Sequence, residues 1–324
     1  MRELHLEERP HRLDQLIGQD DAVAQLKGLS KTGMPHCLLF TGPSGCGKTT
    51  LARIVRKRLK CGDADFVEKN CAQERGIDLV RTLTKLVGLS PIDGDSRVYL
   101  IDECHQLTGE AQAAFLKLLE EPPDHVYFML ATTNPEKLKD TIITRCTQIR
   151  VRGLSEAELC DLVNLVAKKH DCDLDDEVVD KIATVADGSA RKALVLLQQI
   201  MNLDGGSEAQ INVLQQACSE VKAFEICQAL MQQKTPWTKM ARILASVTED
   251  PEGIRWMVLG YCTKAVIGGF SKTKPDDYRK PGKGYKRAAA IMDCFQDNYY
   301  STKKAGLVLS CFNVMHPDSE DSED

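Results

Sequence analysis

No stretch of the sequence approaches the roughly 18 consecutive apolar residues that a membrane-spanning helix needs. The opening MRELHLEERP is charged throughout, so we expect no secretory signal. The 13 cysteines are scattered singly and form no CxxC pair, which favours buried free thiols over disulfides or zinc ligands. These absences predict a cytoplasmic protein with no membrane partner, nucleoid-associated or in the host-cell cytoplasm if the chain is viral.

The net charge of −5 comes from the end of the chain. Residues 317–324, PDSEDSED, carry five acids and no base, and without them 42 basic residues balance 42 acidic ones. This segment has no apolar side chain to bury, so we predict a disordered acidic tail. The neutral body neither requires nor excludes a local basic surface for nucleic acid.

Short apolar runs alternate with helical patterns over residues 1–152, which is typical of a parallel α/β sheet. Most of the runs are nearly all apolar, as strands covered on both faces should be. The expected strands are Cys37–Thr41, Asp65–Lys69, Arg97–Ile101, Val126–Ala131 and Thr147–Val151.

Beyond residue 152 the patterns are helical. A capping box formed by Ser155 and Glu158 opens a helix, and we predict a small helical lid over residues 153–204. The break LDGGS precedes a helical collar, predicted over residues 205–316, that would serve oligomerisation. Its Lys272–Arg287 stretch holds seven bases and two acids, which fits an exposed loop or a site for DNA or a partner.

A complete P-loop follows the first predicted strand and opens a helix. Its glycines let backbone amides wrap phosphates, and the helix N-terminus adds a favourable dipole. We therefore predict binding of ATP with Mg²⁺, in which Lys48 neutralises the β- and γ-phosphates and Thr49 binds the metal ion. The expected nucleotide-binding residues are Gly42, Pro43, Ser44, Gly45, Cys46, Gly47, Lys48, Thr49 and Thr50.

The apolar run VYLI ends in two acids, Asp102 and Glu103. At the carboxyl edge of a parallel sheet both carboxylates would face the ligand crevice. Asp102 would hold Mg²⁺ and Glu103 would polarise the attacking water; the alternative is that Glu103 caps the next helix. The letters DECH also fit a DExH helicase, but no second RecA-like domain follows, so His105 is better explained as a helix-start residue.

Several motifs occur in the order found in clamp-loader ATPases. They are GPSGCGKTT, YLIDECH, FLKLLEEPP, ATTNPEKL, TRC and GSARKAL. The chain resembles bacterial gamma/tau subunits and replication factor C small subunits well over residues 4–200, and as an all-helical collar beyond. The resemblance implies an AAA+ fold with a five-stranded parallel sheet, a lid and a collar.

The resemblance also assigns catalytic roles. Arg145 matches the arginine finger that enters the neighbouring subunit's site, although Thr144 departs from the usual serine before it; the alternative is a surface ion pair. Arg191 resembles the lid arginine that reports nucleotide state. Thr133, with Asn134 as second choice, lies where sensor 1 is found.

Further positions follow from the same resemblance. Asn70 resembles the polar switch that holds the catalytic glutamate away until DNA binds, or is a simple strand-end asparagine. Arg75 and Arg81 match positions that face DNA, unless they form a solvated face. The adenine pocket would include Arg9, Pro10 and Ile17.

The sequence departs from the bacterial subunits in lacking their four-cysteine zinc module, since only Cys61 and Cys71 lie nearby; we expect no zinc. The motifs together predict an ATPase that opens a sliding clamp and places it on primer-template DNA, contacting the DNA backbone. Its partners would be the clamp, other copies of itself and a companion subunit in a five-membered ring. The alternatives are a AAA+ branch-migration or recombination-maintenance motor, and a scaffolding subunit that never hydrolyses ATP.

Overall fold

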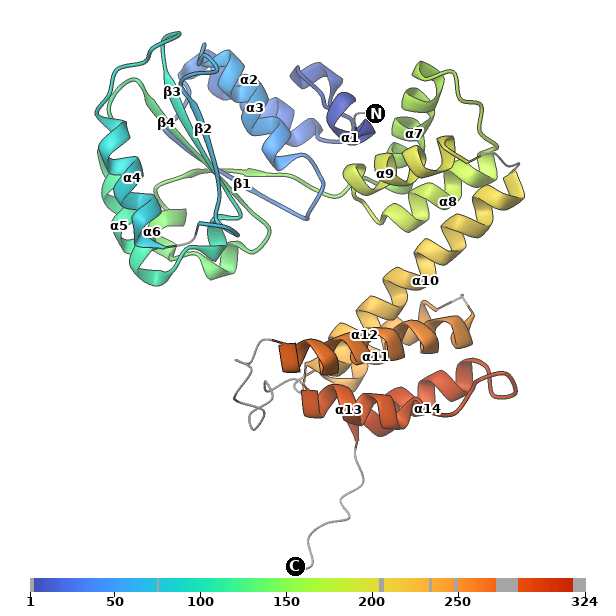
Figure 1. Cartoon of the computed structure of the whole chain (residues 1–324). Coiled ribbons are helices and arrows are strands. Elements are labelled where there is room, and N and C mark those ends of the chain that lie inside the picture. Colours follow the sequence, from blue (N-terminus) through green and yellow to red (C-terminus); the bar gives the residue numbers. More distant parts are fainter. Residues whose placement is uncertain are drawn as a thin grey trace, which may run out of the picture. The chain divides into compact units, whose positions relative to one another are not determined.

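A computed structural model describes residues 3–74, 76–203, 207–232, 235–247, 250–271 and 285–316. The chain divides into two compact units, Met1–Ser207 and Glu208–Asp324 (Figure 1). The predicted tail at 317–324 and residues 272–284 of the basic stretch lie outside the described residues. Within the described part, no helix is both long and apolar enough to cross a membrane. The finer division of the first unit at residue 152 stays a prediction.

The first unit is built on a parallel sheet of five strands in the order β2-β3-β4-β1-β5. Each strand bound lies within one residue of its predicted position. The α/β fold class is therefore confirmed. The strands are β1 (Cys37–Thr41), β2 (Phe66–Asn70), β3 (Arg97–Asp102), β4 (Val126–Thr132) and β5 (Thr147–Arg150).

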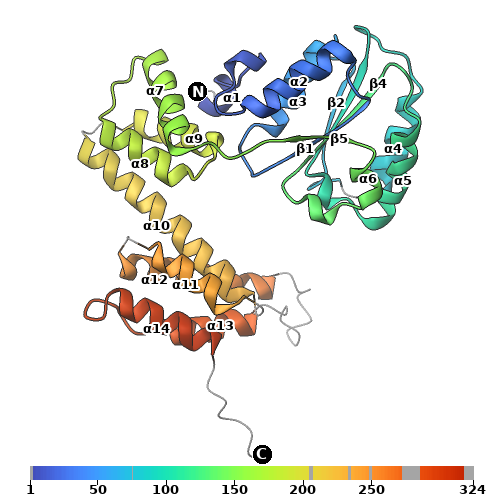
Figure 2. The same cartoon turned by 180° about the vertical axis from the view of Figure 1, so that it is seen from behind.

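Helices cover both faces of this sheet, which explains why its central strands are mostly apolar. On one face lie α2 (Asp20–Thr32) and α3 (Lys48–Arg58), and on the other α4 (Ile77–Val87), α5 (Gly109–Glu120) and α6 (Asp140–Ile143) (Figures 1 and 2).

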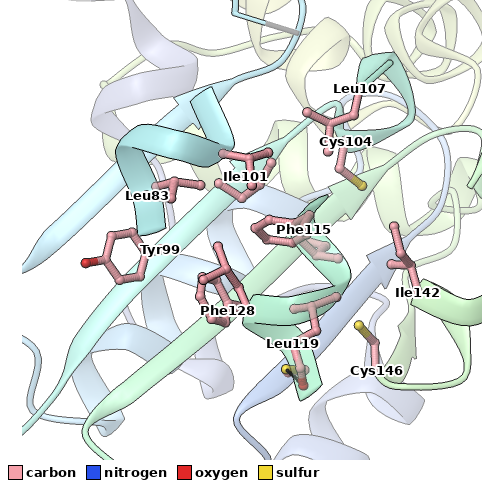
Figure 3. Packing of buried hydrophobic residues seen from close by; sticks show 14 of the residues in the cluster. Leu83, Tyr99, Ile101, Cys104, Leu107, Phe115, Leu119, Phe128, Ile142 and Cys146 are labelled. Atoms are coloured by element: carbon pink, nitrogen blue, oxygen red, sulfur yellow. Dashed lines mark hydrogen bonds between the residues drawn. The ribbon is translucent and has the colours of Figure 1, made fainter. Parts of the chain in front are cut away.

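Side chains alternate between the two faces, and one of the resulting cores is drawn in Figure 3. Phe128 of β4 lies at its centre, with ring centroids 5.4 Å from Phe115 and 5.5 Å from Tyr99. All three side chains are buried. Burial of one such ring contributes about 1.5–3 kcal/mol, so this layer holds α5 firmly against the strands that carry the acids.

A buried ion pair lies at the start of β2 and β3. Arg97 Nη2 donates to Asp65 Oδ1 at 2.8 Å, and the two side chains are 7% and 0% exposed. The other carboxylate oxygen of Asp65 accepts from the backbone N–H groups of Ile92 and Asp93. Burial raises the pKa of Asp65, but these hydrogen bonds and the Arg97 charge outweigh it, so the pKa is lowered. Asp65, predicted to begin the strand, instead anchors a loop and β2 begins at Phe66.

The helices after the sheet are α7 (Glu156–Lys169), α8 (Asp176–Ala186) and α9 (Ala190–Met201). The predicted capping box is confirmed at the start of α7, where Ser155 accepts from Glu158 N and Glu158 accepts from Ser155 N. Glu158 also pairs with both terminal nitrogens of Arg152. The Arg152 hydrogen bonds and the Ser155 N–H lower the pKa of Glu158 to about 2.

Short elements complete this unit. They are α1 (Leu4–Glu7) and three 3-10 helices, η1 (Leu13–Gln15), η2 (Cys104–Gln106) and η3 (Pro135–Lys137). The N-terminal segment contacts the lid helices, because Leu4 N donates to Gln198 of α9 and Lys169 pairs with Glu8. The cysteines whose side chains the structure describes are free, and most are buried.

The described part of the second unit is helical, as predicted. Its core combines apolar faces with a buried pair, in which Arg255 Nη2 lies 2.7 Å from Glu252 Oε1 and Tyr299 N donates to Glu252 Oε2. The helices are α10 (Ser207–Met231), α11 (Trp237–Ala245), α12 (Pro251–Ser271), α13 (Tyr285–Cys294) and α14 (Lys304–Met315).

Candidate functional site

The loop between β1 and α3 has the backbone of a phosphate cradle. Gly42, Gly45 and Gly47 all have positive φ values, of +151°, +77° and +104°. A Cβ on Gly42 would lie 1.9 Å from the Val151 carbonyl oxygen, and one on Gly45 would lie 2.1 Å from Ser189 Oγ. Only glycine fits at these two positions. The loop then enters the N-terminus of α3, where free amides and the helix dipole attract anions.

Lys48, the first residue of α3, points back over this loop. Its Nζ donates to the carbonyl oxygens of Gly42 at 2.8 Å and Pro43 at 2.7 Å, and the residue is 6% exposed. Burial lowers the pKa of Lys48, although the charges of Glu103 and Asp102 oppose the shift. The ammonium is therefore fixed over the cradle, beside the two acids.

Two oxygen groups suited to Mg²⁺ meet at the end of β3. Thr49 Oγ1 donates to Asp102 Oδ2 at 3.2 Å, while Asp102 Oδ1 accepts from Glu103 N at 2.9 Å. Among the described residues no cluster of three or more His, Cys, Asp and Glu side chains could hold a metal ion. Thr49 and Asp102 alone fit Mg²⁺, which commonly takes one or two protein oxygens and completes its shell with phosphates and water.

Glu103 follows in a left-handed conformation, with φ 51° and ψ 39°. It precedes η2, but its side chain makes no capping hydrogen bond, so the alternative of a simple helix cap does not describe it. Its Oε2 lies 3.3 Å from His105 Nδ1 and 3.5 Å from Thr133 Oγ1. The helix-start histidine expected from the sequence thus lies in a 3-10 helix and contacts the proposed catalytic carboxylate.

A cavity of about 740 Å³ joins these groups to the N-terminal segment and to the lid helices. It brings together most of the residues predicted to bind nucleotide or take part in hydrolysis. Those lining it are Arg9, Pro10, Ile17, Ser44, Gly45, Cys46, Gly47, Lys48, Thr49, Thr50, Asn70, Asp102, Glu103 and Arg191.

The lid side of the cavity includes apolar residues that the sequence analysis missed. Leu162 and Leu165 of α7 and Leu194 of α9 line it, and Leu165 is 62% exposed. Because α7 buries Leu159 and Val163 on another face, the sequence pattern alone gives no signal that Leu165 lines a site. Flat apolar walls of this kind suit a nucleobase.

The lid touches the phosphate cradle directly at the start of α9. Arg191 N donates to the Gly45 carbonyl at 3.2 Å, and Ser189 caps the helix by accepting from Lys192 N. Arg9 also lines the cavity. Burial lowers its pKa, repulsion from Arg53 and Arg191 adds to the shift, and Glu68 opposes it. The two arginines that line the cavity beside the P-loop favour a highly charged anion there.

Asn70 and Thr133 occupy strand ends near Glu103. Asn70 is the last residue of β2, in register with Asp102, and its Oδ1 accepts from Ala72 N at 2.9 Å. Thr133 follows β4, and its hydroxyl donates to Asn134 Oδ1 at 2.9 Å. Thr133 does not line the cavity itself, but its hydroxyl lies 3.5 Å from Oε2 of Glu103, which does.

Arg145 and Arg81 lie on the surface, outside the cavity. Arg145 Nη2 lies 2.6 Å from Glu120 Oε1. This is the surface ion pair that the sequence analysis gave as the alternative to an arginine finger. Arg81 pairs with Asp78 one turn earlier on α4. Arg75, the other predicted DNA contact, lies outside the described residues.

The sequence matches known proteins of DNA replication. Residues 65–155 match the family model described as DNA polymerase III, delta subunit. The chain is 34% identical to DNA polymerase III subunit gamma of Buchnera aphidicola, over 61% of this chain and 61% of that protein. It is 34% identical to the replication factor C small subunit of Natronomonas pharaonis, over 63% and 64% of the two chains. The chain therefore spans less than two thirds of these relatives.

A longer match covers 78% of the chain and 42% of DNA polymerase III subunit tau of Escherichia coli, at 30% identity. Among solved structures, a mutant of the Thermotoga maritima RuvB aligns with a TM-score of 0.55 at 19% identity, covering 87% of this chain and 92% of that one. This identity establishes a shared fold alone. The predicted resemblance to clamp-loader AAA+ subunits is confirmed by the sequence matches.

Proposed function

We propose that this chain, a relative of clamp-loader AAA+ subunits, uses ATP to open a sliding clamp and place it on primer-template DNA. The observation that carries the proposal is the single cavity that joins a P-loop, a strand-end pair of acids and a lid arginine. Subunits of this kind hydrolyse ATP, and the geometry of the cavity supports the same chemistry in this chain.

Each cavity residue then has a role in phosphoryl transfer to water. The P-loop amides and Lys48 bind the β- and γ-phosphates, and Thr49 with Asp102 holds Mg²⁺. Bound there, Mg²⁺ neutralises charge that develops on the phosphates. Glu103 orients the attacking water and accepts its proton. Arg191 contacts phosphate from the lid, and Thr133 supports the sensing of the γ-phosphate.

Opening a clamp also requires that ATP bound to one subunit be contacted by the neighbouring subunit. We propose that Arg145 acts on the site of the adjacent copy, since it lies on the surface outside its own cavity. Several copies of this chain and one companion subunit would then form a five-membered ring. Arg81, and Arg75 outside the described residues, would contact the DNA backbone, and Asn70 would restrain Glu103 until DNA arrives. Such an assembly works where the DNA is, in the cytoplasm.

Steady-state hydrolysis with the full chain and its companion tests the proposal. We expect turnover to rise strongly only when primer-template DNA and the clamp are both present, and Glu103→Gln to abolish turnover while ATP still binds. Stimulation by branched or duplex DNA alone, with no effect of a clamp, would instead indicate the branch-migration motor that shares this fold. ATP binding without any turnover would indicate a scaffolding subunit.

A further inference from the structure

His105 is a buried histidine to which the proposed hydrolysis assigns no role. It lies in η2, two residues after Glu103, and is 9% exposed. Its Nδ1 lies 2.9 Å from Thr132 Oγ1 and 3.3 Å from Glu103 Oε2. The other ring nitrogen, Nε2, lies 3.1 Å from the amide nitrogen of Gln106. Both nitrogens of the ring are therefore engaged.

These contacts select one tautomer of the neutral imidazole. An unprotonated Nδ1 would direct its lone pair at the Glu103 carboxylate, which is repulsive. The Gln106 amide nitrogen is a donor, so Nε2 has to accept. Both requirements place the proton on Nδ1, where the N–H donates to the Thr132 hydroxyl and lies 3.3 Å from Glu103 Oε2.

Thr132 joins the imidazole to the central sheet. It is the last residue of β4 and is fully buried. Its hydroxyl accepts from Asn134 N at 3.0 Å, and its carbonyl accepts from Gly42 N, at the start of the P-loop, at 3.3 Å. One strand residue thus holds both the phosphate cradle and the histidine.

Glu103 needs such support, because its side chain has three rotatable bonds and its backbone is in the left-handed region. The contacts with His105 and Thr133 both fall on Oε2, so neither engages the other carboxylate oxygen. A general base has to lie within hydrogen-bond reach of the proton that it takes, and a small misplacement of its carboxylate lowers the rate of the chemical step.

We propose that His105 is a positioning residue, whose Nδ1–H lies beside Glu103 Oε2 and attracts it electrostatically, and which so directs Oε1 toward the attacking water. The inference rests on the proposed role of Glu103 as the base. His105 does not line the cavity, so it acts on turnover and leaves ATP binding to the P-loop and lid.

Two substitutions separate the ring nitrogens. The amide of His105→Asn lies near the place of Nδ1, whereas the amide of His105→Gln lies near that of Nε2. For His105→Gln we expect kcat for ATP to fall roughly 10–100-fold, as when a partner that orients a functional group is removed. KM should change less than about twofold, and His105→Asn should retain more turnover than His105→Gln. The control is His125→Asn, since His125 Nε2 contacts only the Leu89 carbonyl among the contacts found for it.

The two single substitutions distinguish this inference from the function it rests on. If His105 acts through Glu103, turnover should be abolished in Glu103→Gln and reduced but still measurable in His105→Gln. Loss of turnover in Glu103→Gln with full turnover in His105→Gln would overturn the inference and leave the function intact. Full turnover in Glu103→Gln would instead contradict the proposed base.

The contact between His105 and Glu103 can also be observed without turnover and without a substitution at His105. The imidazole ¹⁵N spectrum of the full chain should show a protonated Nδ1 and an unprotonated Nε2 for His105, and Glu103→Gln should shift the Nδ1 resonance. A protonated Nε2, or a Nδ1 chemical shift that does not change in Glu103→Gln, would contradict the inference. This holds even if every His105 variant failed to fold.

Discussion

Arg145 Nη2 lies 2.6 Å from Glu120 Oε1, and Arg145 Nη1 donates to the Thr141 carbonyl at 2.9 Å. Glu120 belongs to the LLEEPP motif and Arg145 to TRC, so two motifs that carry the resemblance meet at one surface pair. The two side chains are 46% and 36% exposed, and an exposed pair of this kind is worth at most about 1 kcal/mol. Glu120 therefore orients Arg145 without preventing it from reaching another subunit.

If Arg145 acts on a neighbouring copy, substitutions at the finger and at the P-loop should complement each other. We expect Arg145→Ala to lower DNA-stimulated turnover by roughly 10³-fold, the lower range for an arginine finger, with ATP affinity unchanged. Mixing Arg145→Ala chains with Lys48→Ala chains should restore part of the turnover, because the first supplies intact P-loops and the second intact fingers. Turnover is measured across a series of mixing ratios.

Arg12→Ala is the control for the loss of a surface arginine, since Arg12 also forms an exposed pair, with Asp14. It should leave DNA-stimulated turnover and complementation unchanged. Absence of any recovery in the mixtures would mean that Arg145 serves only its own chain.

A switch role for Asn70 predicts a change in the DNA dependence of hydrolysis. Asn70→Ala should raise turnover without DNA and leave the DNA-stimulated maximum unchanged, so the ratio of the two falls. Asn70→Asp keeps an acceptor for Ala72 N but cannot donate to a carboxylate. If Asn70 restrains Glu103, the ratio of DNA-stimulated to DNA-free turnover in Asn70→Asp should equal that in Asn70→Ala. If Asn70 only closes the turn, the ratio should equal that of the unsubstituted chain.

The sheet and the phosphate site could be predicted because they depend on local patterns. A run such as Cys37–Thr41 has no polar residue except at its end, which identifies a strand covered on both faces, and the P-loop follows it directly. The contact between His105 and Glu103 could not be predicted, because it depends on the left-handed turn at Glu103 and on Thr132 from a strand about 30 residues later. Long-range pairing of this kind leaves no spacing signal in one sequence.

Asp65 illustrates the same limit at the edge of a strand. The polar residue before an apolar run was predicted to begin β2, whereas its carboxylate turns inward to Arg97, 32 positions away. The role of Leu165 could not be predicted either. A leucine on the exposed face of an amphipathic helix is identified as part of a site only when the opposite wall of the cavity is known.

The buried Asp65–Arg97 pair should contribute to the acid stability of the first unit. Asp65→Asn leaves the Arg97 charge buried without its partner, which costs about 3–5 kcal/mol of unfolding free energy near neutral pH. Because folding lowers the pKa of Asp65, its contribution is present above the unfolded pKa of about 3.9 and is lost as the pH falls below it.

Urea unfolding, followed from pH 7 downward, measures both effects. The gap between the midpoints of the unsubstituted chain and Asp65→Asn should narrow as the pH drops below about 4. Asp95→Asn, which breaks the exposed pair with Lys60, should leave the midpoint unchanged. A gap that does not depend on pH would show that packing, not charge, explains the effect.

Gly18 should be essential for the junction between the N-terminal segment and the lid. Its φ is +67°, and an added Cβ would lie 2.6 Å from Glu158 Cδ and 2.7 Å from Leu154 Cδ2. Gly18→Ala therefore has to displace the Glu158–Arg152 pair, and we expect a loss of more than about 1 kcal/mol of stability together with weaker ATP binding. Gly28→Ala in α2, where nothing lies within 4 Å of the added Cβ, should be neutral or slightly stabilising. Thermal melting and nucleotide titration compare Gly18→Ala with Gly28→Ala. Equal melting temperatures and equal ATP affinities would contradict the predicted clash.

Transfer of a labelled clamp onto circular primed DNA tests the proposed function most directly. With ATP, the full chain and its companion should leave clamps on the circle that survive gel filtration and leave when the DNA is cut to a linear form. Lys48→Ala should transfer none. A chain that hydrolyses ATP on branched DNA yet leaves no clamp on the circle with any companion would contradict the clamp-loader function.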